Sequence, residues 1–563
     1  MTTRQTTSPF ALTRRAFVLS ASAAAAFGIR AADGEKPLLR IGAMSDDHLH
    51  AERPKTHQRT KACFDLFRRE QVDVVVDTGD IADLSHVTEL QWFRNCFDTA
   101  FAGTDTVPFF MVANHDYGYV PGRKRTDPEI IRGAADALKM ESLNPCAVVK
   151  GYRFASYYQD EKIEVLEENV RKAVAENEAG RPVFVVTHVP PFGTTTGTAH
   201  WSSAAIRKVL DKYPQVVHLS GHIHAAITWS ANIWQGGFTA INLGAHAQYS
   251  NPIDGEATIL DVYADRIDVR RYEAVSGREI GVDDHWSIPL PLDPAHGPYR
   301  PEARAAKLPK PAMPADMAAA FAQSADGARA SLTFRSALPP GKTLRYLVTL
   351  ESRQDDGSWK FLTTVNWRVP QTLDDAPVRT CSFVANLLEP GRRHRATVTP
   401  ANSLERAGGA GVVEFDVPAN PLQALPPERT QVVRVQKGQS PKGREIKAGA
   451  DGWIGPDTNF VALLPEGLAA ALKDRGTVTC VVDLGSEQGD APCTLTLAKY
   501  AAGTGEFKMN VGPRIYTRPG KYAAHRYAWQ IKARDLAAGD RLCVFVREGA
   551  PARYRFNSVR FFV

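Results

Sequence analysis

Five short apolar runs in the first half of the chain each end on side chains that can bind a metal ion. The runs, with the polar residues that follow them, are residues 38–44 with Asp46, Asp47 and His48; 72–76 with Asp80 and Asp83; 107–113 with Asn114, His115 and Asp116; 182–187 with His188; and 216–220 with His222 and His224. Helical stretches between the runs predict a layered α/β domain. Ligands of α/β sheets gather outside the carboxyl ends of the strands, so we expect these side chains along one edge. A single histidine after a strand is usually structural, but five such strand ends together predict a cluster.

The second run shows how the sequence places one of these side chains. Residues 72–83 read V-D-V-V-V-D-T-G-D-I-A-D. The three consecutive valines suit a strand buried on both faces, and Gly79 lets the chain turn sharply where the strand ends. The pattern thus places Asp80 directly after the turn, and we propose that it bridges two metal ions if the other strand ends supply the remaining ligands. Asp77 lies on the same strand, and the pattern assigns it no role.

The residue types agree with a binuclear metal site. A pair of divalent ions about 3.5–4 Å apart needs a shared anionic ligand, further carboxylates, and imidazole or amide ligands that leave room for water. The seven cysteines contain no C-x-x-C pair, so thiolate zinc sites and a dense disulfide framework are disfavoured. Cys480 and Cys493 either pair in an oxidising compartment or remain isolated thiols, the interpretation that we favour.

Taken in order, the motifs D-x-H, G-D-x-x-D, N-H-D, a lone histidine and G-H-x-H resemble the calcineurin-like metallophosphoesterases over residues 38–273. The closer resemblance is to the branch that includes class III cyclic-nucleotide phosphodiesterases. The purple acid phosphatase branch is disfavoured, because this chain has His48 where the D-x-G motif of that branch has glycine. It also has Asp83 where the G-D-x-x-Y motif has tyrosine. The resemblance implies an α/β layered metallophosphoesterase domain, a β-sandwich flanked by helices, over residues 37–288.

The resemblance also implies a metal-dependent hydrolase of phosphoric esters, phosphodiesterase-like, with two ions of Fe, Mn or Zn. The implied ligands are Asp46, His48, Asp80 and His224 for one ion, and Asp80, Asn114, His188 and His222 for the other. A hydroxide that bridges the two ions would attack phosphorus. His115 would protonate the leaving oxygen, with Asp83 orienting it.

Two alternative functions stay open. A phosphomonoesterase or nucleotidase would use the same metal core and differ only in its pocket walls. A non-catalytic surface protein that binds carbohydrate or acts as a scaffold would keep the fold alone. The complete ligand set argues against the second alternative, because a binding module has no need to keep these side chains together.

The sequence departs from the family pattern in two places. The usual glycine before Asn114 is Ala113. Where the family commonly has a further apolar strand, residues 152–158 pass almost directly into a helix predicted over residues 160–177. We therefore expect a narrower sheet on that side.

Two loops supply candidate contacts to the expected partner, a small phosphate ester. Arg123 lies in a short basic run after His115 and is placed to meet a phosphate, although such runs are usually solvated loops. His200 lies beside Trp201 in a Thr/Gly-rich loop and is placed to contact a base or a sugar.

Residues 1–32 are expected to be an export signal. Arg14 and Arg15 precede an alanine-rich apolar stretch, which resembles a twin-arginine signal and predicts a periplasmic or extracellular protein with no transmembrane helix in the mature chain. The alternative is an uncleaved N-terminal anchor, which the weak apolarity of alanine disfavours. The formal net charge of +6 includes four arginines of this segment, so no nucleic-acid-binding surface is evident.

The rest of the chain predicts two all-β sandwich domains. Residues 289–314 are rich in proline and alanine and predict a linker. Residues 315–418 resemble a fibronectin type III domain, with His394 or an arginine in place of the aromatic expected at the corner. Residues 425–563 predict a jelly-roll-like sandwich, a fold that often binds carbohydrate. Its candidate stacking residues are Trp453, Tyr516, Tyr522 and Trp529, although aromatic side chains in a sandwich are more often core.

Overall fold

The structure, a computed structural model, describes most of the chain beyond residue 34. Described are residues 35–418, except 121, 196–197, 199–201, 247–252, 281–284, 325–328, 340–342, 370–375, 403 and 405. Further on, it describes residues 431–436, 458–463, 476–486, 493–500, 507–511, 515–517, 524–535, 541–547 and 554–562. The predicted export signal therefore lies outside the described residues.

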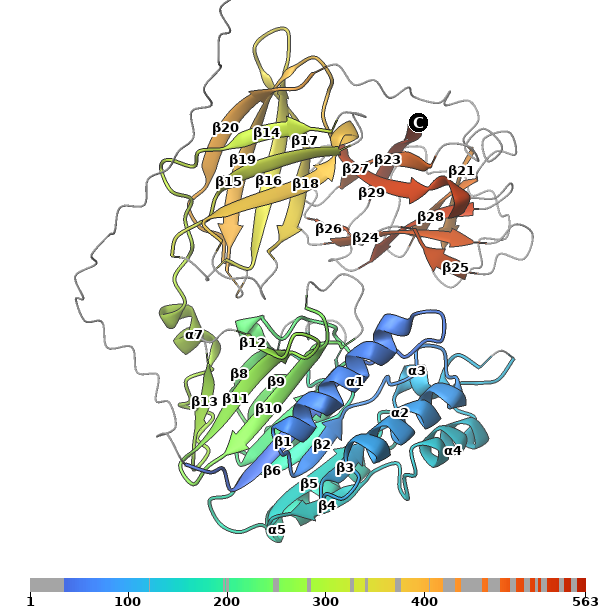
Figure 1. The fold of residues 1–563 in the computed structure, drawn as a ribbon, viewed down its shortest axis with the longest axis vertical. Coiled ribbons are helices and arrows are strands. Elements are labelled where there is room, and N and C mark those ends of the chain that lie inside the picture. Colours follow the sequence, from blue (N-terminus) through green and yellow to red (C-terminus); the bar gives the residue numbers. More distant parts are fainter. Residues whose placement is uncertain are drawn as a thin grey trace, which may run out of the picture. The chain divides into compact units, whose positions relative to one another are not determined.

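Two β-sheets form the centre of the first domain (Figure 1). One has the order β12-β11-β10-β1-β2-β3, with β13 also paired to β11; its strands are β1 (Leu39–Met44), β2 (Val74–Asp77), β3 (Val107–Phe110), β10 (Glu256–Val262), β11 (Arg266–Glu273), β12 (Arg278–Ile280) and β13 (Trp286–Pro289). The other has the order β4-β5-β6-β7-β9-β8, with strands β4 (Cys146–Val149), β5 (Tyr152–Tyr157), β6 (Val183–Thr187), β7 (Val216–Ser220), β8 (Ile233–Gln235) and β9 (Thr239–Asn242).

The two sheets pack face to face, and their central strands are buried on both sides. In β2, Val74 and Val76 point into the core between the sheets, whereas Val75 joins the core under the outer helices. In β6, Phe184 points between the sheets and Val185 points outward. The alternation follows from the period of two along a strand. Burial on both faces is therefore the reason why these strands read as continuous apolar runs.

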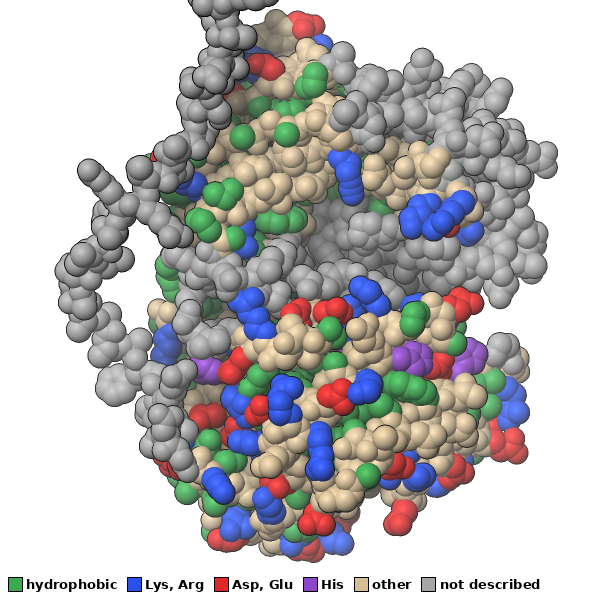
Figure 2. Space-filling model, in the orientation of Figure 1, with side chains coloured by type: hydrophobic (Ala, Val, Ile, Leu, Met, Phe, Trp, Pro, Cys, Tyr) green, Lys and Arg blue, Asp and Glu red, His purple; other side chains and the backbone are tan. Residues whose placement is uncertain are grey.

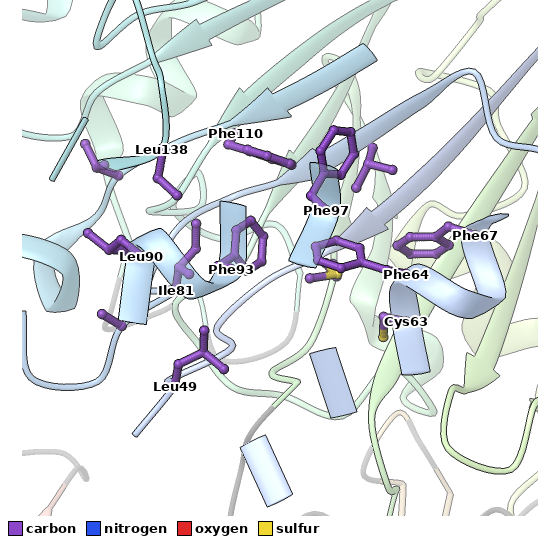
Figure 3. Close-up of a cluster of buried hydrophobic side chains, with 14 of the residues drawn as sticks. Leu49, Cys63, Phe64, Phe67, Ile81, Leu90, Phe93, Phe97, Phe110 and Leu138 are labelled. Atoms are coloured by element: carbon purple, nitrogen blue, oxygen red, sulfur yellow. The ribbon is translucent and has the colours of Figure 1, made fainter. Parts of the chain in front are cut away.

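Helices cover the outer faces of both sheets. The helices are α1 (Pro54–Arg69), α2 (Val87–Ala100) and α4 (Pro128–Ala137) on one side, α5 (Ile163–Ala175) and α6 (Ala204–Leu210) on the other, and the single turn α3 (Asn114–Tyr117) after β3. Under α1 and α2, the Phe93 ring lies 5.2 Å from the Phe64 ring and 5.1 Å from the Phe110 ring (Figure 3). In the described part of the chain, no helix is both long and apolar enough to cross a membrane.

The predicted fold class is confirmed for this domain, but the expectation of a narrower sheet is wrong. β5 pairs in parallel with β6 and in antiparallel with β4, so the sheet continues past the residues that follow α4. The two strands are joined by a tight turn at Lys150 and Gly151. Neither short strand carries a strong local pattern, because its stability comes from pairing with strands distant in sequence.

The second domain is a sandwich of two antiparallel sheets. One has the order β14-β15-β18 and the other β17-β16-β19-β20, with strands β14 (Ala320–Gln323), β15 (Arg329–Arg335), β16 (Arg345–Arg353), β17 (Trp359–Arg368), β18 (Val378–Val384), β19 (Arg393–Ala401) and β20 (Gly411–Asp416). The predicted linker before it contains one short helix, α7 (Pro301–Lys307).

His394 occupies the corner of this sandwich. The side chain is fully buried, Nδ1 lies 3.0 Å from the Arg392 carbonyl oxygen, and Nε2 accepts a hydrogen bond from the Glu389 backbone N–H at 3.1 Å. A carbonyl oxygen only accepts, so Nδ1 carries the proton. In immunoglobulin-like sandwiches a tyrosine hydroxyl makes the equivalent bond to the upstream backbone. Histidine therefore replaces that aromatic here.

The last region is also an all-β sandwich, as predicted. Its sheets have the orders β21-β22-β28-β24-β25, with β26 paired to β24, and β27-β23-β29; the strands are β21 (Gln431–Gln436), β22 (Thr458–Leu463), β23 (Thr477–Ser486), β24 (Cys493–Tyr500), β25 (Phe507–Asn510), β26 (Ile515–Thr517), β27 (Ala524–Lys532), β28 (Arg541–Arg547) and β29 (Tyr554–Phe562). Trp529 is fully buried in this sandwich and is a core residue, not a stacking platform. Trp453 and Tyr522 lie outside the described residues, as does the side chain of Tyr516. The Cys480 thiol is buried and free.

Candidate metal centre

The predicted ligand residues lie at the carboxyl ends of strands in both sheets. β1, β2 and β3 run parallel in one sheet, and β6 and β7 run parallel in the other. The residues that follow these strands are Asp46 and His48 after β1, Asp80 after β2, Asn114 after β3, His188 after β6, and His222 and His224 after β7. Parallel strands present their carboxyl ends at the same edge, so the topology collects these side chains.

The backbone at most of these positions is held in a rare conformation. Asp46, His48, Asp80, His222 and His224 have φ angles of 57°, 44°, 58°, 68° and 55°. A left-handed backbone costs a residue other than glycine about 1–3 kcal/mol and persists only where its surroundings enforce it. Backbone hydrogen bonds supply part of that restraint, since Asp46 N–H donates to the Gly79 carbonyl and His48 N–H to the Asp80 carbonyl, both at 3.0 Å. Such strain is typical of functional sites.

Two glycines let the ligand loops approach one another. Gly79 has a φ of +101°, and a Cβ placed on it would lie 2.6 Å from the Ala113 Cβ. The alanine that replaces the usual family glycine therefore fits only because residue 79 has no side chain. A Cβ on Gly221 would collide with Ser45 Oγ and Asp46 Oδ2. The loops after β1 and β7 thus meet in close contact at a ligand carboxylate.

One group of ligand atoms forms around Asp46. The group comprises Asp46, His48, Asp80 and His224, with ligand atoms that all lie within 4.8 Å of one another. His224 Nε2 lies 2.9 Å from Asp46 Oδ1 and 3.1 Å from His48 Nε2. Among the described residues, Asp46 Oδ1 is buried and accepts no hydrogen bond, although His224 is close.

A second group shares Asp80 with the first. It comprises Asp80, His188 and His222. His188 Nε2 lies 3.1 Å from Asp80 Oδ2 and 3.0 Å from His222 Nδ1. Asp80 is the one residue that belongs to both groups, which is the position expected of a bridging ligand.

Hydrogen bonds from Nδ1 orient His48 and His188 so that the Nε2 atom of each ring points into one of these ligand groups. His48 Nδ1 donates to the Asp83 carboxylate at 2.9 Å, and His188 Nδ1 donates to the Thr78 carbonyl at 3.1 Å. In the neutral side chains, each Nε2 therefore carries a lone pair that faces another imidazole nitrogen and a carboxylate. Such lone pairs repel one another unless a cation lies between them. The donor set thus fits a pair of metal ions with mixed nitrogen and oxygen ligands.

The charges of the site also favour bound cations. Burial alone would lower the pKa of His48, but the Asp46 carboxylate beside its ring and the hydrogen bond to Asp83 raise it to about 10. Burial alone would likewise raise the pKa of Asp80, but the charge and hydrogen bond of His188 lower it. Both pKa shifts come from attraction between buried carboxylates and imidazoles that carry positive charge. The same carboxylates would attract a metal ion.

Other buried carboxylates support the loops around Asp80. Asp116 accepts hydrogen bonds from the backbone N–H groups of Asp80, Ala82 and Ala113 at 3.1, 2.8 and 2.8 Å. Burial and the charge of Asp80 raise the pKa of Asp116 to about 7. Asp77, which the sequence left without a role, accepts a hydrogen bond from Gly79 N–H at 2.8 Å. It therefore fixes the turn that delivers Asp80.

Asp83 contacts His115 in the structure, but through its backbone carbonyl and not through its carboxylate as predicted. His115 Nδ1 donates to the Asp83 backbone carbonyl at 2.7 Å, whereas Asp83 Oδ1 lies 3.7 Å from Nδ1 and accepts instead from His48. His115 N–H donates to Asp80 Oδ1 at 2.8 Å, which keeps the residue beside the metal groups. Burial lowers the pKa of His115. Asp83 therefore supports the candidate ligand His48 with its side chain and His115 with its backbone.

Of the two predicted substrate contacts, only Arg123 lies among the described residues, and it pairs with carboxylates outside the ligand groups. Arg123 is exposed and forms ion pairs with Asp127 and Glu129 at 2.5 and 2.9 Å. His200 and Trp201 lie outside the described residues. The site opens to solvent at His224 and His115, whose side chains are each 24% exposed. Contacts to a substrate at Arg123 and His200 stay predictions.

Three supporting residues were missed by sequence reasoning. Arg53 pairs with Asp83 at 2.9 Å, and Ser85 Oγ donates to the His115 carbonyl at 2.8 Å. Gln159, two residues beyond the end of β5, has its Nε2 3.5 Å from Asn114 Oδ1. Only Ser85 lay within reach of sequence reasoning, because it closely follows the G-D-x-x-D motif.

The fold and the site together define a metal-dependent phosphoesterase. Residues 39–226 match the family model of the calcineurin-like phosphoesterases. This part of the chain is therefore a calcineurin-like phosphoesterase domain, and the resemblance inferred from the motifs is confirmed. A search among curated proteins gives no match.

Solved structures with similar folds include two phosphatases. A dimetal phosphatase from Danio rerio is 12% identical, with 45% of this chain and 99% of that chain covered and a TM-score of 0.34. A purple acid phosphatase from yellow lupin is 14% identical, with 45% and 53% covered and a TM-score of 0.35. The Plasmodium protein GAP50 is 10% identical, with 45% and 89% covered and a TM-score of 0.30.

Proposed function

We propose that the protein is an exported phosphodiesterase that hydrolyses small phosphoric diesters with two metal ions. The observation that carries this proposal is the pair of ligand groups that share Asp80, with His115 bound to the same aspartate. Asp46, His48, Asp80 and His224 would hold one ion, and Asp80, Asn114, His188 and His222 the other. Bound metals would supply Lewis acidity at the phosphoryl oxygens and lower the pKa of water.

The protein's own side chains supply orientation and proton transfer. In the hydrolysis, a water molecule loses a proton to solvent and its oxygen bonds to phosphorus, the ester P–O bond breaks, and the leaving oxygen takes a proton. His115 is the candidate donor of that proton, because its Nδ1 is held by the Asp83 carbonyl and its Nε2 is left for the substrate. The hydrogen bond from His115 N–H to Asp80 Oδ1 fixes the imidazole beside the phosphoryl position.

The charge around the site supports a diester over a monoester. A phosphomonoester carries about 1.5–2 negative charges at neutral pH, whereas a diester carries about one. The arginines of the surrounding loops are paired with carboxylates, Arg53 with Asp83 and Arg125 with Asp160, at 2.9 and 3.1 Å. These arginines are thus already neutralised, which suits the less charged substrate.

A side-by-side assay tests this proposal. Purified protein is assayed with bis-p-nitrophenyl phosphate, p-nitrophenyl phosphate and cyclic AMP, and its metals are measured by mass spectrometry. We expect faster hydrolysis of the diesters and two metal equivalents. Asp80→Asn should abolish hydrolysis and reduce bound metal to one equivalent or less. A preference for the monoester would identify a phosphomonoesterase on the same metals, and unchanged activity of Asp80→Asn would contradict the bridge.

Export is supported by the paired arginines of residues 1–32. The twin-arginine route moves folded proteins, which suits an enzyme that binds its metals before transport. The replacement of Arg14 and Arg15 by lysine should retain the protein inside the cell, and fractionation with immunoblotting measures this. Secretion of the double variant at the level of the native chain would contradict the route.

A carbohydrate partner for the last sandwich is proposed on its strand pattern and on Tyr516, whose side chain lies outside those described. Affinity electrophoresis of the full chain in polysaccharide gels tests it. We expect retardation that Tyr516→Ala reduces, and equal migration in gels with and without polysaccharide would reject the partner.

A further inference from the structure

Tyr119 lies against the candidate proton donor. The Tyr119 ring centroid is 4.5 Å from that of His115, with 36° between the ring planes. Its hydroxyl lies 3.4 Å from His115 Nε2. Both residues belong to the segment that begins at α3, but Tyr119 follows the end of that helix, so helical geometry alone does not set the contact.

Ser85 holds the two residues in this relation. Its hydroxyl donates to the His115 carbonyl at 2.8 Å and accepts from the Tyr119 backbone N–H at 2.8 Å. Ser85 is itself buried and has a φ of 59°, a strained backbone that its neighbours must maintain. The segment from His115 to Tyr119 is therefore clamped at both ends by one side chain.

The hydroxyl of Tyr119 lies at the edge of the imidazole that faces the substrate. Because His115 Nδ1 donates to the Asp83 carbonyl, the remaining nitrogen, Nε2, is the one that exchanges a proton with a substrate. The Tyr119 hydroxyl reaches this nitrogen at 3.4 Å, near the outer limit of a hydrogen bond. A leaving oxygen that arrives at Nε2 would therefore meet the Tyr119 hydroxyl as well.

The Tyr119 ring also adds apolar surface to the opening of the site. The residue is 50% exposed, and Leu84, next to Ser85 in the chain, is 39% exposed. Figure 2 shows histidine side chains that reach the surface beside hydrophobic ones. An exposed aromatic face at a proton donor suits a planar leaving group, since aromatic pairs stack in offset geometry.

We propose that Tyr119 is a positioning and specificity residue that meets the leaving group of the ester. Its hydroxyl keeps the leaving oxygen aligned with His115 Nε2, and its ring packs against a planar, aryl or heterocyclic, leaving group. The inference rests on the proposed phosphodiesterase function and adds the class of leaving group.

Two variants separate the hydroxyl from the ring. Tyr119→Phe removes only the hydroxyl, and Tyr119→Leu also removes the aromatic face. The substrates are bis-p-nitrophenyl phosphate and diphenyl phosphate, which have similar shapes, but p-nitrophenolate is the more stable leaving anion and needs less help from a proton donor. Tyr119→Phe should lower kcat about tenfold on diphenyl phosphate, with a smaller loss on the nitrophenyl ester. Tyr119→Leu should also raise KM for both esters.

Tyr213→Phe, a tyrosine packed under α6, is the matched control and should keep native kinetics on both esters. An active native enzyme whose Tyr119 variants behave like Tyr213→Phe would overturn this inference alone. Equal losses of kcat on both esters, together with a lower melting temperature, would also overturn it, because they indicate a merely structural role. A native enzyme that hydrolyses neither ester would overturn the proposed function and this inference together.

Discussion

His48 and Asp83 form a hydrogen bond of 2.9 Å in which the imidazole Nδ1–H donates to the carboxylate. The second carboxylate oxygen pairs with Arg53 at 2.9 Å. Burial alone would raise the pKa of Asp83, but the hydrogen bond and charge of His48, followed by the charge of Arg53, lower it to about 2. The carboxylate of the G-D-x-x-D motif therefore holds a histidine of the candidate metal centre.

Asp83→Asn should weaken metal binding and not only proton transfer. The amide cannot offer His48 a charged acceptor, and loss of such a partner typically lowers metal affinity about 10–100-fold. Competition with a fluorescent chelator measures the affinity. Asp127→Asn removes an equally paired but remote carboxylate and should leave the affinity unchanged. If the variant keeps native metal affinity but loses turnover, the Asp83 carboxylate acts on His115 and not on His48.

Metal removal should destabilise the first domain. The imidazole nitrogens that face one another at 3.0 and 3.1 Å are held together at lower cost when a cation binds them. Metal at a hundredfold excess over Kd should add about 2.7 kcal/mol to the free energy of unfolding. Thermal unfolding with added Mn²⁺ or with a chelator measures the shift, and Asp80→Asn should show a smaller one. An equal melting temperature in both conditions would contradict binding at this site.

Gly221→Ala should damage the metal centre through a steric clash. The added methyl group would meet Ser45 Oγ and Asp46 Oδ2, so the loops after β1 and β7 must separate. We expect at least tenfold weaker metal binding and lower activity. Gly133→Ala in α4 has no atom within 4 Å of the added Cβ and should stabilise the helix by about 0.5–1 kcal/mol. If Gly221→Ala binds metal as tightly as Gly133→Ala does, the inference that these two loops are in close contact is contradicted.

Phe184→Ala should cost about 3–5 kcal/mol in the free energy of unfolding. Phe184 is fully buried between the two sheets and stacks on Phe154, with ring centroids 5.0 Å apart. Phe184→Leu keeps most of the volume and should cost less. Urea unfolding followed by circular dichroism compares the two variants, and equal midpoints would show that this layer of the core is not tightly packed.

The sandwich that contains His394 should lose stability in acid. Burial lowers the pKa of His394 from 6.5, so between 6.5 and that lower value the unfolded chain binds the extra proton. The contribution of the neutral His394 side chain to the stability of the sandwich is fully present above about pH 6.5. It is lost as the pH falls through the lowered pKa of His394. Hydrogen exchange of β19 between pH 7.5 and 5.5 measures this effect. His394→Tyr keeps a side chain that can bond the Glu389 backbone and should show less pH dependence, and equal dependence would assign the effect to another group.

The class of protein and most residues of its candidate metal centre could be predicted from the sequence. Asp80, His188 and His222 each follow within four residues of an apolar run, so the local pattern already places them at strand ends. The topology of parallel strands then requires that they meet. The candidate ligands can therefore be recognised from the few residues that follow each apolar run.

Tertiary structure decided which partner each of these side chains takes. The contact of Asp83 with His48 joins residues 35 positions apart, and the contact of His188 with Thr78 joins residues 110 positions apart. Hydrogen bonds of this kind depend on distances set by the packing of two sheets, which no local pattern encodes. The same holds for Tyr119, because its place beside His115 comes from the clamp by Ser85 of a neighbouring loop. The sequence by itself determined the residues that can bind metal, and the packing of the loops determined their orientation.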